Sequence, residues 1–207
     1  MKYIWINPVT ESMYAPADLS AFLQENGYEA VTVSADWVAI VKEKYKTAVA
    51  ATPNTVMDMR CPKVLDFLKE KALLPEMTIP DIEPILIHCG REISQRKDLR
   101  GAEKIITTPC KALADLGNSL ALPETTFLPW NEFLRQTGSE PTAISLKESP
   151  IPPGFFDGLG FSHCSVTGET EILEQFQNCR SNETDLLELL FCKNGCHNGD
   201  GVKKSTL

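Results

Sequence analysis

The chain has 207 residues and a mass of 22.9 kDa, with 43% hydrophobic and 23% charged residues, which is the composition of a folded domain rather than of a disordered or membrane protein. Its formal net charge of −8 argues against a nucleic-acid partner, because phosphate binding needs a basic surface. The longest apolar runs, at 84–87 and 186–192, are far shorter than the roughly 20 residues of a membrane-spanning helix. The N-terminus lacks a signal-peptide cleavage site, so we expect a cytoplasmic protein without a membrane partner.

Strand and helix signals alternate along the first part of the chain. We expect, in order, a strand at 3–7, a helix from Pro16 that ends before Gly27, a strand at 29–33, a helix through Trp37, Val41 and Tyr45 capped by Ser34, and a strand at 47–51. This order predicts a parallel sheet. A further helix is expected to begin at Pro62, which places Cys61 at a helix N-terminus.

Closely spaced prolines at 78–84 indicate a break between two lobes of a single domain that spans 1–207. The elements expected beyond it are strands at 85–88 and 104–107, a helix at 111–119, a long irregular loop at 138–160, a helix at 169–179, a strand at 186–191 and a glycine-rich loop at 193–201. Cys110 then lies at a turn from strand to helix. The expected fold class is α/β.

Seven cysteines in a chain without a secretion signal favour metal or cluster ligation over a disulfide framework. The sharpest local signal is the segment 192–201, Cys-Lys-Asn-Gly-Cys-His-Asn-Gly-Asp-Gly, where glycines let the backbone wrap around a cluster. A surface turn that carries two free thiols explains the same spacing equally well.

Cys61 and Cys110 each lie beside a proline at the start of an expected helix. The partial positive charge of a helix N-terminus is expected to lower the pKa of such a thiol and to favour the thiolate, which is the form that binds metal. Taken singly, a cysteine of this kind is more often a buried structural residue than a metal ligand.

The order Arg60-Cys61-Pro62, then Thr108-Pro109-Cys110, then 186–201 resembles the catalytic domain of the large subunit of iron-only hydrogenases. The motifs of that family read T-S-C-C-P, P-C-x-x-K and C-P-G-G-C-x-x-G-G-G, and the resemblance covers most of the chain from Lys2 onward. It implies two α/β lobes with mainly parallel sheets and a 4Fe-4S cluster between them. The ligands that it implies are Cys61, Cys110, Cys192 and Cys196, and in the family the last of these also bridges to a diiron unit.

Two departures from the family argue against hydrogen chemistry. Arg60 stands where the family has a proton-donating cysteine, and Leu113 stands where it has a lysine that supports the diiron unit. We therefore expect the cubane without the diiron subcluster, and a role in redox sensing or electron transfer. The ferredoxin-like input modules of the family are absent and its members continue beyond residue 207, so we expect part of a longer protein and a redox partner, or adjacent signalling or ferredoxin domains.

Two alternatives remain at this point, a divergent but active iron-only hydrogenase and a zinc-stabilised or metal-free interaction domain. A zinc site can be drawn from Cys192, Cys196 and His197 together with a Cys–His pair, either His88–Cys89 or His163–Cys164. No familiar zinc spacing is present. For Cys89, Cys164 and Cys179 the simpler interpretation is that they are buried or structurally satisfied.

Overall fold

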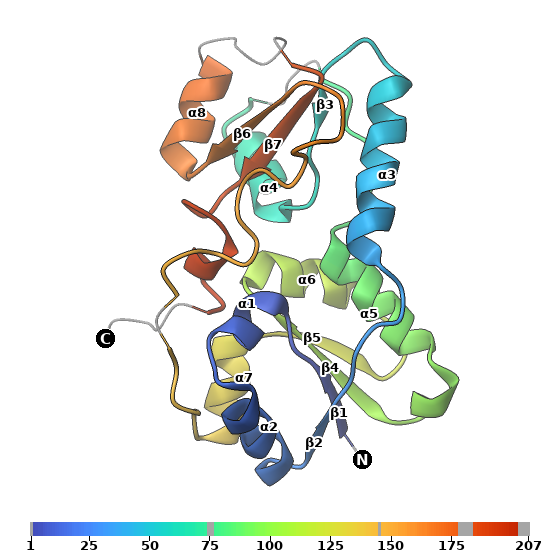
Figure 1. The fold of residues 1–207 in the computed structure, drawn as a ribbon, viewed down its shortest axis with the longest axis vertical. Helices are drawn as coiled ribbons and strands as arrows, with labels where there is room; N and C mark the ends of the chain where they lie inside the picture. Colours follow the sequence, from blue (N-terminus) through green and yellow to red (C-terminus); the bar gives the residue numbers. More distant parts are fainter. Residues whose placement is uncertain (1, 74–76, 145, 178–183, 203–207) are drawn as a thin grey trace. The chain divides into compact units, whose positions relative to one another are not determined.

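Figure 1 shows a computed structural model of the chain, which describes residues 2–73, 77–144, 146–177 and 184–202. The chain forms two compact units, each assembled from segments that are distant in sequence. Unit 1 consists of Met1–Ala35, Leu86–Ile151 and Cys196–Leu207, and unit 2 consists of Asp36–Ile85 and Pro152–Gly195. In the ranges that the structure describes, no helix has the length and apolar character needed to cross a membrane.

Unit 1 is built on a four-stranded sheet in which all neighbouring strands are parallel. In spatial order the strands are β2 (Tyr28–Ala30), β1 (Lys2–Trp5), β4 (Glu103–Thr108) and β5 (Thr125–Pro129). The central pair is in register with Ile4 opposite Ile105, and both side chains are buried. Because the chain leaves β1 toward one edge and β4 toward the other, the β1–β4 boundary is the switch point of the sheet.

Helices cover both faces of this sheet (Figure 1). One face packs against α1 (Pro8–Ser12), α2 (Pro16–Glu25) and α7 (Trp130–Thr137), and the other against α5 (Ile85–Gln95) and α6 (Lys111–Ser119). A 3-10 turn, η1 (Lys97–Leu99), follows α5. Trp130 and Phe133 stack in the first core, and Phe127 fills the second. Because successive side chains of a strand point to opposite faces of the sheet, each strand contributes residues to both cores.

Unit 2 is built on three parallel strands, in spatial order β3 (Val56–Met57), β7 (Leu186–Leu190) and β6 (His163–Thr167). All five residues of β7 are buried, as expected for a central parallel strand. Leu187 and Leu189 face α4 (Pro62–Glu70) and α8 (Glu169–Gln177), whereas Leu186 faces α3 (Trp37–Ala50) and the aromatic residues of the 152–161 segment. The same alternation places Glu188 on the side of Leu186.

The expected fold class is confirmed at this level, because the described residues form an α/β protein with two all-parallel sheets and eight α-helices. Proline starts α2 and α4 as expected, and the expected helix at 111–119 is α6. In the segment 138–160, the described residues form no helix or strand and contain one isolated bridge, from Ala143 to Tyr14.

Several local expectations are wrong. The segment 85–88 is the first turn of α5 rather than a strand, because Leu86, Gly90 and Ile93 recur at helical spacing and bury one face. The segment 47–51 belongs to the end of α3, so the third strand of the unit 1 sheet is β4. Asp36, not Ser34, caps α3, since its carboxylate accepts the N–H of Ala39 at 2.9 Å.

Two glycines lie against the ring of Phe127. A Cβ added to Gly117 of α6 would be 2.2 Å from the Cγ atom of Phe127, and one added to Gly90 of α5 would be 2.3 Å from its Cζ atom. Both helices therefore approach β5 as closely as they do only because these positions lack a side chain.

We predict that Gly117→Ala destabilises the protein by about 1–3 kcal/mol through overpacking, although alanine is the better helix former. Ser119→Ala, an exposed change in the same helix, is the control. Urea denaturation measures both free energies of unfolding, and a Phe127→Leu background should recover part of the loss. An increase in stability for Gly117→Ala would contradict the close packing.

Candidate functional site: two pairs of cysteines

Cys61 and Cys192 lie near one another in unit 2, at the carboxyl edge of its sheet. β3 and β7 pair with Met57 opposite Leu187, and the N–H of Asp58 continues the ladder to the carbonyl of Leu187 at 2.9 Å. The same register carried forward brings Cys61 opposite Phe191, whose N–H donates to the Cys61 sulfur. Cys192 is the next residue, and it interacts electrostatically with Cys61.

Cys61 is the N-cap residue of α4, as the sequence indicates. Burial raises the pKa of its thiol to about 11, and the N–H groups of Phe191 and Val64, which act in the opposite direction, do not outweigh it. The expectation that the helix N-terminus lowers the pKa of Cys61 is therefore wrong, because loss of hydration is the larger effect. Metal binding at this thiol has to displace a proton.

Cys110 and Cys196 belong to unit 1, where a glycine-rich turn lies on the start of α6. Cys110 caps α6 directly after β4, and Cys196 opens the 3-10 turn η3 (Cys196–Asn198). The N–H of Gly201 donates to the carbonyl of Pro109 at 3.0 Å, and the N–H of Lys111 donates to the carboxylate of Asp200 at 2.9 Å. The turn thus satisfies backbone groups at the N-terminus of α6.

The two backbones approach so closely that glycine is required. A Cβ at Gly199 would lie 2.2 Å from the carbonyl oxygen of Pro109 and 3.0 Å from that of Cys196. The chain at Pro109 and Cys110 is therefore adjacent to the turn at 199–201, which follows Cys196. Both lie beside the switch point of the sheet, where open α/β sheets commonly bind ligands.

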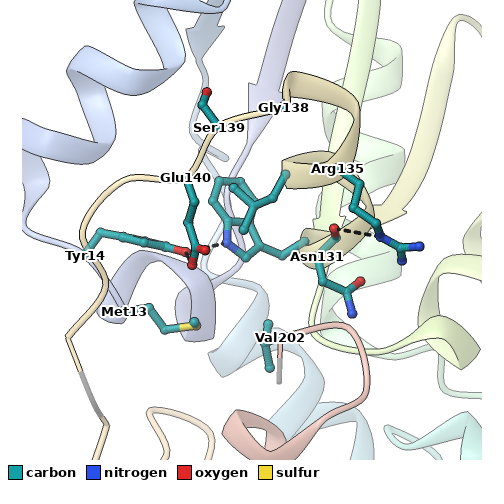
Figure 2. Close-up of a pocket in the computed structure, with 10 residues that line it drawn as sticks. Met13, Tyr14, Asn131, Arg135, Gly138, Ser139, Glu140 and Val202 are labelled. Atoms are coloured by element: carbon teal, nitrogen blue, oxygen red, sulfur yellow. Dashed lines mark hydrogen bonds between the residues drawn. The ribbon is translucent and has the colours of Figure 1, made fainter. Parts of the chain in front are cut away.

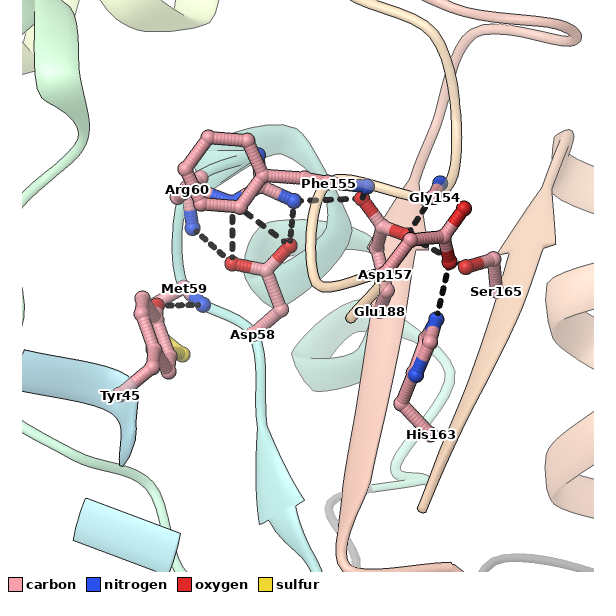
Figure 3. Close-up of polar contacts among 10 residues, drawn as sticks. All are labelled: Tyr45, Asp58, Met59, Arg60, Gly154, Phe155, Asp157, His163, Ser165 and Glu188. Atoms are coloured by element: carbon pink, nitrogen blue, oxygen red, sulfur yellow. Dashed lines mark hydrogen bonds and ion pairs between the residues drawn. The ribbon is translucent and has the colours of Figure 1, made fainter. Parts of the chain in front are cut away.

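Arg60 is held by two buried carboxylates in unit 2 (Figure 3). Its guanidinium donates to Asp58 through Nε at 3.0 Å and through Nη2 at 2.7 Å, and Nη2 also reaches Glu188 at 2.6 Å. The guanidinium carbon lies 3.8 Å from the centre of the Phe155 ring. Burial lowers the pKa of Arg60, but the two carboxylates outweigh it and the net shift is upward.

Glu188 also ties the 152–161 segment to the sheet. Its carboxylate accepts the N–H of Gly154 at 2.7 Å and of Phe155 at 3.2 Å, together with the hydroxyl of Ser165. Sequence reasoning missed Asp58 and Glu188. The sequence did contain one signal for Glu188, which is an acidic residue in the middle of the apolar run Leu186–Leu190. A carboxylate buried in such a strand needs a charged or hydrogen-bonding partner.

The remaining candidates from the sequence lie elsewhere. Cys89 is buried within α5, where burial raises the pKa of its thiol to about 12, and Cys164 lies in β6. His163 pairs with Asp157 at 2.9 Å. Leu113 is buried in α6, and Cys179 lies outside the described residues. Among the residues that the structure describes, no three His, Cys, Asp or Glu side chains gather as a metal site.

Unit 1 also contains an open pocket of about 540 Å³ (Figure 2). Its lining includes Met13, Tyr14, Trp130, Arg135 and Glu140. The Tyr14 hydroxyl accepts the indole N–H of Trp130 at 2.8 Å and donates to Glu140 at 3.4 Å, and burial raises the pKa of Tyr14 to about 12. None of the four cysteines lines this pocket.

No protein-family model matches this sequence, and no curated protein shows significant similarity to it. The thiol pairs and the triad of charges beside Cys61 therefore carry the functional argument.

We predict that Gly199→Ala loosens the turn on α6, because the backbone carbonyl of Pro109 cannot rotate away from a new Cβ. If the substitution destabilises the closed turn by about 1–2 kcal/mol, the population of the open turn rises by about 5–30-fold. The rate at which the Cys110 and Cys196 thiols are alkylated should rise accordingly, as measured by mass spectrometry. Lys193→Ala, an exposed change nearby, should leave that rate unaltered; equal rates in Gly199→Ala and the parent chain would contradict the prediction.

Proposed function

We propose that the chain is an iron-hydrogenase-like protein that binds one 4Fe-4S cluster through Cys61, Cys110, Cys192 and Cys196, and that it senses redox state or transfers electrons without turning over hydrogen. One observation carries the proposal. Each unit holds two of these four cysteines: Cys61 and Cys192 interact in unit 2, and in unit 1 the turn at 199–201 that follows Cys196 lies against Pro109 and Cys110.

The donor set suits an iron–sulfur cube. None of the four cysteines is in a disulfide, and thiolates are the ligands that such clusters use. Only three residues separate Cys192 from Cys196, so the chain itself links the two pairs. Glycines beside both pairs give the backbone room to wrap, at 195 next to Cys192 and at 199 and 201 next to Cys110.

When bound, the cube supplies one-electron redox chemistry. The residues of the chain hold it and shield it. The N–H groups of Val64 and Phe191 already point at the Cys61 sulfur, and hydrogen bonds of this kind tune a cluster.

The geometry around Arg60 supports the absence of hydrogen turnover. A guanidinium does not give up its proton at ordinary pH, and two carboxylates stabilise its charged form here. Leu113, buried against the core of unit 1, offers no donor. The two positions at which the family supports proton delivery and the diiron unit are thus filled by residues that do neither.

We predict that anaerobic reconstitution yields about four irons per chain with a broad visible absorption band. Serine at any of the four positions should remove most of both, because a hydroxyl is a harder and poorer ligand than a thiolate. Cys89→Ser and Cys164→Ser are the matched controls and should load normally. Iron content and the spectrum measure the result.

Two outcomes would contradict the proposal. One zinc per chain without iron would favour the zinc-stabilised interaction domain. Iron loading that is insensitive to serine at Cys61 or Cys110 would remove those residues from the ligand set.

We also predict negligible hydrogen evolution or uptake by the loaded chain after treatment with the diiron cofactor and its maturation proteins. The loss of a positioned acid typically costs about two to four orders of magnitude in rate. A gas assay and infrared spectroscopy measure the outcome together. Sharp carbonyl and cyanide bands with robust turnover would establish the divergent active hydrogenase instead.

A further inference from the structure

The edge of the unit 1 sheet at β2 is open, because among the described residues β2 pairs with β1 alone (Figure 1). The N–H of Val31 donates to the carbonyl of Ile4 at 2.9 Å. Alternate residues of a strand bond to the same neighbour, so Glu29 and Val31 bond to β1. The backbone N–H and C=O groups of Tyr28 and Ala30 therefore point away from the sheet.

The other edge of the same sheet is covered. In β5 the N–H and the carbonyl of Phe127 both bond to the side-chain amide of Asn118, each at 2.8 Å. Just beyond β2, the carbonyl of Thr32 accepts from the guanidinium of Arg96 at 3.2 Å. Within the part of the chain that the structure describes, no side chain covers the two outward residues of β2 in this way. Their donors and acceptors can therefore pair with another strand.

A pocket of about 590 Å³ lies beside this open edge. Its walls are Ser20, Leu23 and Gln24 of α2 and the stretch 27–30 that contains β2. The side chain of Tyr28 is on the same face of the sheet, since its ring packs on that of Phe133 with the ring centroids 5.1 Å apart. A strand added to β2 would thus direct every second side chain toward the pocket. This combination is typical of peptide recognition by strand addition.

The charges around the edge are of one sign. All charged residues of α2 and β2 are acidic, namely Asp18, Glu25 and Glu29, and all three are exposed. The sequence has no lysine or arginine from 3 to 41. Lys2, which precedes this stretch, is paired with Glu103 at 3.2 Å. A second copy of the same edge would bring like charges together, which destabilises strand pairing, so the charge favours a basic occupant.

We propose that the β2 edge and the pocket beside it bind an extended, basic segment of a partner protein, which joins the unit 1 sheet as a fifth strand. The backbone of the segment bonds to Tyr28 and Ala30. Its alternate apolar side chains enter the pocket beside Leu23, and its basic side chains, on the opposite face, lie beside Glu29. The surface belongs to unit 1 alone and involves no cluster, so the inference does not depend on the proposed function.

Two labelled peptides of equal length test the proposal on the full chain, one of alternating valine and lysine and the other of alternating valine and glutamate. Fluorescence anisotropy measures their affinities at low and high salt, and amide chemical shifts in nuclear magnetic resonance map the binding site. We expect the lysine peptide to shift amides of α2 and β2 and to bind more weakly as salt rises. The glutamate peptide should bind at least about tenfold more weakly.

Three variants separate strand addition from general attraction. Ala30→Pro removes an outward N–H at an edge position that tolerates proline, so the variant should fold and lose most of the binding. Glu29→Lys should weaken binding of the lysine peptide by about fivefold, because an attractive exposed pair becomes a repulsive one. Glu174→Lys, an exposed change of the same charge on α8 of unit 2, is the control and should bind as the parent chain does.

Equal affinities for the two peptides, unaltered binding by folded Ala30→Pro, or shifts that map to another strand would overturn the proposal. If Ala30→Pro does not fold, the comparison of Glu29→Lys with Glu174→Lys decides it. Failure of the lysine peptide to bind at millimolar concentration would also overturn it. Dimerisation of the parent chain through β2, measured by sedimentation, would assign the edge to a second copy instead. Iron loading is measured separately, so either proposal can fail without the other.

Discussion

Unit 2 depends on the ion pairs that Arg60 makes with Asp58 and Glu188. Removing one partner from a buried pair of this kind costs about 3–5 kcal/mol, because the remaining charge loses both water and its counter-charge. The pairs join the end of β3 to the middle of β7, and through Glu188 they fix the 152–161 segment over the sheet. Where β3 ends and α4 begins is therefore set by the same contacts that place Cys61.

In unit 1, backbone contacts rather than ion pairs fix the position of the cysteine at the start of the helix. The turn that contains Gly199 and Gly201 lies so close to Pro109 that side chains are excluded, and Asp200 reaches the first turn of α6. In both units a cysteine caps a helix after a parallel strand, and a second cysteine arrives from the C-terminal part of the chain. Parallel strands all end at one edge, so loops that follow them converge there.

The chemistry of Cys61 differs from that of a reactive thiol. Burial raises the pKa of Cys61, so it is a poor nucleophile in the absence of metal. The cluster that we propose would have to displace the proton of that thiol when it binds. At the cluster that we propose, Arg60, which is fixed by two carboxylates, would not exchange protons with a substrate.

The sequence by itself determined the class of fold and the starts of α2 and α4. Proline at 16 and 62 and the apolar strands at β1, β4 and β7 act through local sterics and hydrophobic periodicity, which need no tertiary contact. It also singled out the four cysteines, because thiols in glycine-rich or proline-flanked turns are a local pattern.

Only the tertiary structure decided the remaining points. The close packing of α5 on β5 depends on Gly90, which leaves room for the ring of Phe127, and no local pattern contains that contact. The pairing of Cys61 with Cys192, and of Arg60 with Glu188, depends on strand register between residues about 130 apart in the chain. We expected the helix N-terminus to lower the pKa of Cys61. The pKa rises instead, because burial of the thiol has a larger effect than the helix dipole, and the sequence does not reveal that burial.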